Sequence, residues 1–360
     1  MSARYSLHCI LPPHILENVA KHGDEAARHA AIDSLAADHS LRSARLANAI
    51  VTNAQLGPQY GNLLDEAGRG VQRRTIYDCH QSEELRSATV ARSEGASATG
   101  DVAVDEAYAG LGATYDFYYD AYERDSIDNR GLPLNGYVHY GHGYDNAFWD
   151  GSEMVFGDGD GPLFNRFTIS IDVIGHELTH GVTASEANLQ YFQQSGALNE
   201  HFSDVGGACV KQHSLGQTAD QADWLIGQGL LGPNVQGRAL RDMANPGTAY
   251  DDDVLGKDPQ PAHMNDYVQT TKDNGGVHIN SGIPNKAFHT LAITLGGHSW
   301  EKAGVIWYST IRDPRLRSNA QFRTFARATM RNAGQLFGSN SAEVTAVYDS
   351  WHAVGVTIQR

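Results

Sequence analysis

The sequence predicts an α+β fold in which a strand-rich part comes first and a mainly helical part follows. Between about residues 75 and 161, short apolar runs are separated by Gly, Asn and Asp, which is typical of strands joined by turns. After about residue 170, apolar side chains recur at helical spacing instead. The segments with this spacing lie near 171–185, 196–213, 284–296, 301–312, 318–335 and 341–354.

The composition is that of a soluble globular protein, because 41% of the 360 residues are hydrophobic. The formal net charge is -15, from 27 Lys and Arg against 42 Asp and Glu. This charge opposes the counterion release that drives nucleic-acid binding, so we expect no nucleic-acid partner. No apolar run approaches the roughly 20 residues that a membrane span needs. Pro12 and Pro13 interrupt the N-terminal stretch, so we expect neither an ordinary signal peptide nor an anchor.

The N-terminal residues are expected to form a separate unit. Residues 1–56 are rich in Ala, Leu and Arg and show helical spacing after the Pro-Pro pair. Residues 57–74 contain several Gly and Arg residues, which indicates a linker and a place for proteolytic processing. The chain has three widely separated cysteines, Cys9, Cys79 and Cys209. Their odd number and spacing exclude a disulfide framework and a CxxC metal site.

The strand-rich part contains one predicted helix. Residues 100–122 have helical spacing, with Asp101 near the start of the helix. The apolar runs that predict strands are Thr75–Asp78, 137–140, 147–149 and 154–156, and a Gly-Asp-Gly-Asp-Gly turn follows at 157–161.

The first predicted helix after residue 170 carries the pattern His-Glu-x-x-His. Its apolar residues, spaced by three or four, are Ile171, Ile174, Leu178 and Val182. His176 and His180 are four residues apart on another face, so that two imidazoles can reach one ion. Glu177 lies beside them. A hydrolytic zinc site needs three protein ligands, an open position for water and a nearby carboxylate that does not bind the metal.

The next helix is predicted to supply the third ligand. Glu200 and Asp204 share one face of it, four residues apart, and Glu200 is our expected zinc ligand. Asp204 would accept the free ring N–H of a ligand histidine, and Asn199 could serve the other histidine. The alternative is a chance His-Glu-x-x-His pattern on an ordinary helix. The second motif, which follows after 19 intervening residues, and the helix-disfavouring Gly175 and Gly181 argue against that alternative.

From about Tyr77 to the C-terminus, the chain resembles the thermolysin-like metallopeptidases. The matching stretches are Asn146–Trp149, the turn at 157–161, the zinc helix, 196–200 and Asp273–Gly282. Zinc aminopeptidases share the first motif, but the strings around Glu200 and His278 match the endopeptidases. The resemblance implies a two-subdomain zincin fold, with a β-rich subdomain at 75–185, a helical one at 186–360 and the zinc helix between them.

The resemblance also implies roles for residues outside the zinc helix. His278, backed by Asp273, and Tyr191 would donate to the oxyanion of the tetrahedral intermediate. Without the motif, His278 would be read as a structural histidine and Tyr191 as a packed aromatic residue. Glu177 would take a proton from zinc-bound water and return it to the leaving amine.

Substrate-binding residues are implied in the same way. Asn146, Ala147 and Arg241 would hold the backbone of a protein or peptide substrate, with Arg238 as a rival to Arg241. The pocket for the residue after the scissile bond would be formed by Phe164, Phe167, Val173, Ile226, Leu230 and Leu240. These side chains are all apolar, so we expect a neutral endopeptidase that cleaves before bulky hydrophobic residues, although one or two of them could simply be core residues.

The calcium pattern of many relatives is broken here. Asp172 and Asp223 remain, but Lys211, Leu225 and Gln228 stand where acidic residues are usual. A Lys ammonium can lie among carboxylates in place of a metal ion, so we expect at most one Ca²⁺ at this place, or none.

Residues Cys9–Leu16 resemble the short Pro-Pro prosegment of the protealysin-like subgroup, which implies a zymogen whose own prosegment inhibits it. Leu11, Ile15 or Leu16 could occupy an apolar cleft at low ordering cost. One alternative is an ordinary helical extension. Another is a Cys9 thiolate in the fourth position of zinc.

Two other functions compete with a broad endopeptidase: a catalytically silent binding protein, and a cytoplasmic regulatory or toxin-like peptidase with a narrow target. The intact ligand set, Glu177 and His278 argue against the first. The resemblance favours secretion, by a route without an ordinary signal peptide, with a cytoplasmic location as the alternative.

Overall fold

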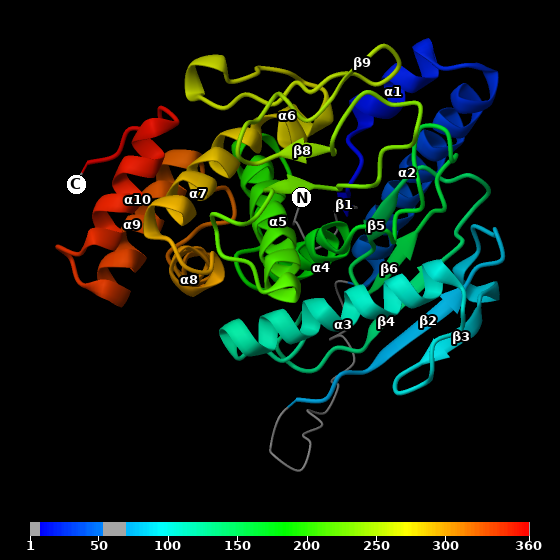
Figure 1. Ribbon diagram of the computed structural model, residues 1–360, viewed down its shortest axis with the longest axis horizontal. Helices are drawn as coiled ribbons and strands as arrows, with labels where there is room; N and C mark the ends of the chain where they lie inside the picture. Colours follow the sequence, from blue (N-terminus) through cyan, green and yellow to red (C-terminus); the bar gives the residue numbers. More distant parts are fainter. Residues whose placement is uncertain (1–7, 53–69, 360) are drawn as a thin grey trace.

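The computed structural model describes residues 8–52 and 70–359, and the side chains of residues 9–39 and 70–359 within them. Figure 1 shows a sheet at one end of the molecule, helices α4 and α5 in the middle and helices α7 to α10 at the other end. Most of the linker predicted at 57–74 lies outside the described residues. The predicted α+β fold class is confirmed.

The large sheet has six strands in the order β1-β5-β6-β4-β2-β3. Their bounds, in that order, are His8–Cys9, Ala147–Trp149, Glu153–Phe156, Leu134–Val138, Arg74–Asp78 and Thr89–Ser93. Strand β1, from the N-terminal segment, pairs antiparallel with β5 and so forms one edge of the sheet. The pairs β4–β6 and β4–β2 are parallel.

Strand β4 differs from its predicted position at 137–140. It begins at Leu134 because it pairs along its whole length with β2, from Arg74↔Leu134 to Asp78↔Val138. It ends at Val138 because His139 has a φ of 54°, a left-handed conformation that does not continue a strand.

Helix α3, Val102–Tyr122, confirms the helix predicted at 100–122, and it packs against the sheet (Figure 1). Asp101 caps it: its carboxylate accepts hydrogen bonds from Ala103 N at 2.9 Å and Val104 N at 3.2 Å. A carboxylate at this position satisfies backbone N–H groups that have no partner within the helix.

The remaining helices lie close to the predicted segments, except α6, which was not predicted as a helix. Their bounds are Ile171–Ser185 for α4, Gln193–Leu215 for α5, Asp273–Asn280 for α6, Gly282–Leu295 for α7, Val305–Ile311 for α8, Phe322–Phe337 for α9 and Ala342–Ala353 for α10. Two short hairpins lie between α5 and α6: β7 (Leu225–Ile226) with β8 (Arg241–Asp242), and β9 (Asp251–Asp252) with β10 (Gly256–Lys257). No helix among the described residues is long and apolar enough to cross a membrane.

Glycines let α4 and α5 approach closely. A Cβ atom at Gly207 of α5 would lie 2.3 Å from the backbone oxygen of Asp172, and one at Gly175 of α4 would lie 3.1 Å from the Cα of Gly207. Because a side chain at either position would force the helices apart, these glycines set the distance between the two helices that carry the predicted zinc ligands.

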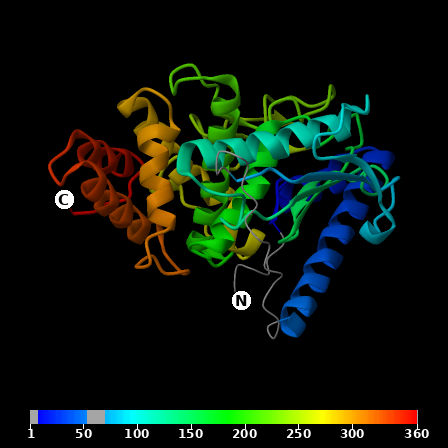
Figure 2. The same ribbon diagram turned by 90° about the horizontal axis from the view of Figure 1, so that it is seen from below.

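The N-terminal segment packs against the rest of the chain through two helices, α1 (Pro13–His22) and α2 (Glu25–Thr52). Figure 2 shows α2 as a long helix running beside the sheet. Asp38 of α2 accepts hydrogen bonds from Tyr144 and, at 3.0 Å, from Asn146 Nδ2, while Ser34 Oγ accepts one from Asp145 N at 2.9 Å. The N-terminal segment is therefore joined to the strand β5 region by both strand pairing and buried polar contacts.

Candidate metal centre and active site

Helices α4 and α5 bring His176, His180 and Glu200 together at their contact. The two histidine Nε2 atoms are 3.1 Å apart, and oxygens of Glu200 lie 3.4 Å from His176 Nε2 and 3.5 Å from His180 Nε2. All three side chains are buried. Among the described residues they form the one cluster of His, Cys, Asp or Glu ligand atoms that could hold a metal ion.

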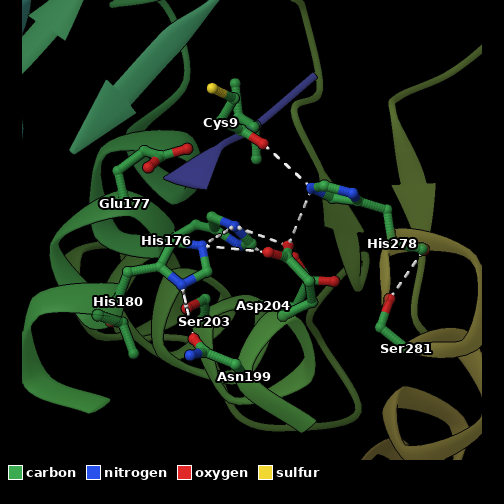
Figure 3. A network of polar contacts seen from close by, with 12 residues as sticks. Cys9, His176, Glu177, His180, Asn199, Ser203, Asp204, His278 and Ser281 are labelled. Atoms are coloured by element: carbon green, nitrogen blue, oxygen red, sulfur yellow. Dashed lines mark hydrogen bonds and ion pairs between the residues drawn. The ribbon is translucent and has the colours of Figure 1, made fainter. Parts of the chain in front are cut away.

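The second nitrogen of each histidine has its own acceptor. His176 Nδ1 lies 2.8 Å from Asp204 Oδ1, and His180 Nδ1 lies 2.8 Å from Asn199 Oδ1 and 3.0 Å from Ser203 Oγ (Figure 3). When both Nδ1 atoms donate, both Nε2 atoms present lone pairs to one another, which repel unless a cation lies between them. Two nitrogens bound to one zinc ion at tetrahedral geometry would be about 3.3 Å apart, so the cluster fits zinc.

Glu177 extends from α4 on the same side as the two histidines but toward β5. Its Oε2 accepts a hydrogen bond from Trp149 N at 3.1 Å, while the buried Oε1 has no hydrogen-bond partner among the described residues. Burial, and then the negative charge of Glu200, raise the pKa of Glu177 well above its ordinary value. Figure 3 shows this carboxyl group next to the N-terminal segment at Cys9.

His278 faces the cluster from α6 and is held by Asp273. Asp273 accepts hydrogen bonds from His278 Nδ1 at 2.6 Å and from the backbone N–H of His278 at 2.9 Å. Residues 273–276 all have positive φ, a conformation that the Asp-Asn-Gly-Gly sequence tolerates and that turns Asp273 back onto the histidine. Burial opposes a charge on His278, but Glu200 and Asp273 raise its pKa overall. Tyr191 OH donates to Glu200 and lies 3.2 Å from His278 Nε2.

His278 and the three residues expected to hold a substrate backbone contact the main chain of the N-terminal segment. The contacts run in sequence: His278 Nε2 to Cys9 O at 3.2 Å, Ile10 N to Ala147 O at 3.2 Å, Arg241 Nη1 to Ile10 O at 3.1 Å and Leu11 N to Asn146 Oδ1 at 3.1 Å. Arg241 is buried and also donates to Asp204, whereas its rival Arg238 has a side chain 54% exposed and pairs with Asp242.

The six predicted pocket residues are all buried. Most of them contact another of the six or a residue next to one. The rings of Phe164 and Phe167 are 6.2 Å apart, and Leu240 N donates to Ile226 O at 2.9 Å. Leu230 follows in the same turn, where Leu230 N donates to Gly227 O. Val173 comes from α4, next to Asp172, whose carboxylate accepts a hydrogen bond from Gly227 N at 2.8 Å. The structure thus gathers residues from four separate parts of the chain near Arg241.

The Cys9 thiol does not face the histidines, so the alternative of a thiolate zinc ligand is wrong for this structure. Cys9 packs in a cluster with Cys79, Tyr144, Phe148 and Val155, and Figure 3 shows its sulfur directed away from His176 and His180. The reason is its place in strand β1. There the backbone carbonyl of Cys9 faces His278, while the side chain enters the small apolar cluster.

Lys211 lies between Asp172 and Asp223, the two carboxylates that remain of the expected calcium pattern. Its Nζ lies 2.9 Å from both carboxylate oxygens of Asp223, 3.2 Å from Asp172 Oδ2 and 3.3 Å from Leu225 O. Burial lowers the pKa of Lys211, but the two carboxylates raise it overall, so the ammonium stays charged between them.

Two contacts in the site were missed from the sequence. The Trp149 backbone N–H that holds Glu177 is a main-chain group, and no residue-type pattern identifies it. Ser203, which shares His180 Nδ1 with Asn199, lies in the same helical motif as Glu200 and Asp204. Because Ser203 lies one helical turn after Asn199, on the same face, its contact with His180 could have been predicted.

The fold and the site together define a zinc-dependent neutral metalloendopeptidase of the His-Glu-x-x-His type. The family model for the thermolysin metallopeptidase catalytic domain matches residues 58–184, and the model for its alpha-helical domain matches residues 187–356. The chain therefore belongs to the thermolysin metallopeptidase family, and it is of the protealysin type.

Two of the relatives are similar over nearly the whole chain. An extracellular metalloprotease of Pectobacterium carotovorum subsp. carotovorum is 51% identical over 351 residues, which cover 98% of this chain and 97% of the relative. The structure of the precursor of protealysin, a metalloproteinase from Serratia proteamaculans, has a TM-score of 0.86 and 51% identity, and covers 97% of this chain and 100% of that one. Thermolysin of Alicyclobacillus acidocaldarius is 40% identical over 263 residues, which cover 71% of this chain and 46% of the relative.

Proposed function

We propose that this endopeptidase is made as a latent precursor and, once active, cleaves peptide bonds before bulky hydrophobic residues. One observation carries the proposal: the main chain of Cys9, Ile10 and Leu11 makes the hydrogen bonds expected of a bound substrate. A covered cleft with a complete set of catalytic side chains is what a zymogen requires.

His176, His180 and Glu200 are the proposed zinc ligands. Their inward-facing atoms support this assignment, as does the buried Glu200 Oε2, which has no hydrogen-bond partner among the residues described. Asp204 and Asn199 would fix the histidine tautomers. When bound, zinc would supply Lewis-acid polarisation of the scissile carbonyl and activation of water.

Glu177 is the proposed general base. Trp149 N–H holds one carboxylate oxygen, which leaves Oε1 directed into the site to accept the proton of the attacking water. The same carboxyl group would then deliver this proton to the leaving amine.

His278 and Tyr191 are the proposed donors to the oxyanion. His278 Nε2 already lies 3.2 Å from a peptide carbonyl, that of Cys9, while Asp273 keeps its Nδ1 occupied. Donors fixed before the reaction stabilise developing negative charge without the cost of reorganising solvent. Asn146, Ala147 and Arg241 would hold the substrate backbone in the register that Cys9–Leu11 now takes.

The proposed specificity follows from the side chains near Arg241. Phe164, Phe167, Val173, Ile226, Leu230 and Leu240 present only apolar atoms, and burying a Leu or Phe side chain among them would contribute roughly 1.5–3 kcal/mol. A charged side chain would lose its hydration there without a partner.

Latency is assigned to residues 1–56, and processing to residues 57–74. Ile10, Leu11, Ile15, Leu16 and Val19 are all buried, so docking removes their apolar surface from water. The catalytic unit would then comprise a β-rich subdomain at 75–185 and a helical one at 186–360. At the usual calcium position, the ammonium of Lys211 would replace the ion. Because similar proteins are named extracellular metalloproteases, we propose that the protein is secreted.

Casein hydrolysis by the processed chain tests the proposal. We expect hydrolysis that a zinc chelator abolishes and added zinc restores, with bulky hydrophobic residues at the new N-termini of the products. Absence of hydrolysis by processed, zinc-loaded protein would support a silent binding protein. Cleavage of one protein target alone would support a narrow regulatory peptidase, and products with other N-terminal residues would refute the specificity.

A further inference from the structure

We propose that His201, Asn285 and Trp307 are positioning residues for the zinc ligand His176, which they orient through a buried chain of hydrogen bonds ending on Asp204. This inference rests on the proposed zinc site. It adds three residues from α5, α7 and α8 that touch neither the metal position nor the cleft.

The hydrogen-bond chain consists of four consecutive short contacts. Trp307 Nε1 donates to His201 Nε2 at 2.7 Å, and His201 Nδ1 lies 2.7 Å from Asn285 Oδ1. Asn285 Nδ2 donates to Asp204 Oδ2 at 2.8 Å. The other oxygen, Asp204 Oδ1, lies 2.8 Å from His176 Nδ1.

Only one arrangement of protons satisfies this chain. The indole N–H of Trp307 can only donate, so His201 Nε2 must present a lone pair and the ring proton must lie on Nδ1. That N–H needs an acceptor, which fixes Asn285 with its oxygen toward His201 and its NH2 group toward Asp204. The Asp204 carboxylate can only accept, so both ends of the chain impose the same direction.

Within the described residues, the two ring nitrogens of His201 have Asn285 and Trp307 as their hydrogen-bond partners, and the rest of its surroundings is apolar. His176, His201, Asp204, Asn285 and Trp307 are each fully buried. The rings of Phe288 and Phe325 lie 6.4 Å and 6.3 Å from the His201 ring. If the imidazole turned over, both nitrogens would face apolar groups and lose their hydrogen bonds, which is costly in the interior.

The chain holds Asp204 from the side of the core, whereas Arg241 holds it from the side of the cleft. Arg241 donates both to Asp204 and to Ile10 O of the N-terminal segment, so one of its contacts changes when the segment leaves. Asn285 contacts nothing in the cleft through its two side-chain bonds. The contact from Asn285 to Asp204 therefore stays in place whatever the cleft contains.

Two substitutions at His201 separate this role from simple packing. His201→Asn keeps an amide that can donate to Asn285 but loses ring packing, whereas His201→Phe keeps the ring and loses the donor. Mutating the outer partners of ligand histidines typically lowers metal affinity 10–100-fold. We therefore expect the zinc dissociation constant to rise about tenfold in His201→Phe and about threefold in His201→Asn. A purely structural residue would give the opposite order.

The measurement is competition for zinc between the full chain and a chromophoric chelator. His289→Phe is the matched control, because His289 also packs against a Trp ring but takes no part in the hydrogen-bond chain. Its ring centroid lies 5.1 Å from that of Trp224. We expect wild-type affinity in this control. Equal affinities of wild type and His201→Phe, or a weaker His201→Asn than His201→Phe, would overturn the inference. A wild-type chain that binds no zinc would instead overturn the proposed function.

A second measurement needs no variant at His201. Long-range ¹H–¹⁵N correlation spectra of the zinc-loaded wild-type chain report which ring nitrogen of His201 is protonated. We expect the Nδ1–H tautomer, and the Nε2–H tautomer would overturn the inference.

Discussion

Lowering the pH from 7 to 5 is expected to weaken the docking of the N-terminal segment through His14 of α1. His14 Nε2 lies 3.2 Å from Tyr250 OH, and its buried Nδ1 has no hydrogen-bond partner in the part of the chain that the structure describes. Burial lowers the pKa of His14 from 6.5 to about 4. Asp273 and Glu17 oppose this shift, while His278 and Arg241 add to it. The docked segment therefore holds His14 neutral.

The magnitude follows from linkage between protonation and docking. An undocked His14 would titrate near its ordinary pKa, and the docked one titrates at about 4, so docking loses stability as the pH falls from 6.5 to about 4. One pKa unit corresponds to 1.36 kcal/mol, so the loss between pH 7 and pH 5 is about 2 kcal/mol, or about twentyfold in the docking equilibrium.

Hydrogen–deuterium exchange of the backbone amides of α1 measures this loss directly. The full chain would carry Glu177→Ala to prevent self-processing, with and without His14→Gln as the non-titrating substitution. Between pH 7 and 5, the opening free energy of α1 should fall by about 2 kcal/mol more in the protein that retains His14 than in the His14→Gln variant. Equal pH dependence in the two proteins would refute the reasoning.

Three further predictions concern the catalytic unit. Glu177→Ala should retain zinc, measured by elemental analysis, yet lose nearly all peptide hydrolysis; surviving hydrolysis would rule out Glu177 as the base. Selective removal of calcium should leave the melting temperature and activity unchanged, because Lys211 neutralises Asp172, whereas Lys211→Glu should make the melting temperature depend on calcium. Gly207→Ala should lower the unfolding free energy by on the order of 3 kcal/mol in denaturant titrations, since its Cβ would lie 2.3 Å from Asp172 O. The control Gly334→Ala, whose Cβ would have no neighbour nearer than 3.7 Å, should not destabilise the protein.

The cluster of His176, His180 and Glu200 could be predicted because it depends on spacings within two helices. His176 and His180 are fixed relative to each other by one helical turn, and Glu200 and Asp204 by another. The glycines between the two helices also had a readable meaning, since a helix accepts Gly175 only where close packing compensates for its low propensity. The sequence therefore predicted both the side chains that gather and the tight contact between the two helices that carry them.

What could not be predicted depends on partners distant in the chain. Strand β1 spans two residues and exists because it pairs with β5, so no local pattern marks it. The direction of the Cys9 side chain follows from that pairing, and the thiolate alternative failed for this reason. The start of β4 was likewise set by its pairing with β2. The sequence around His201 did not indicate its proposed role either, because that role requires Trp307, which lies 106 residues later.

The central claim is that the zinc centre is complete but covered. It is tested most directly by the rate of hydrolysis of a peptide with a bulky hydrophobic residue after the scissile bond, measured per bound zinc before and after residues 1–56 are cut away and removed. We predict one zinc per chain in both forms, and hydrolysis only after the segment has been removed. Full hydrolysis by the uncut chain, with residues 1–56 still in place, would contradict the account.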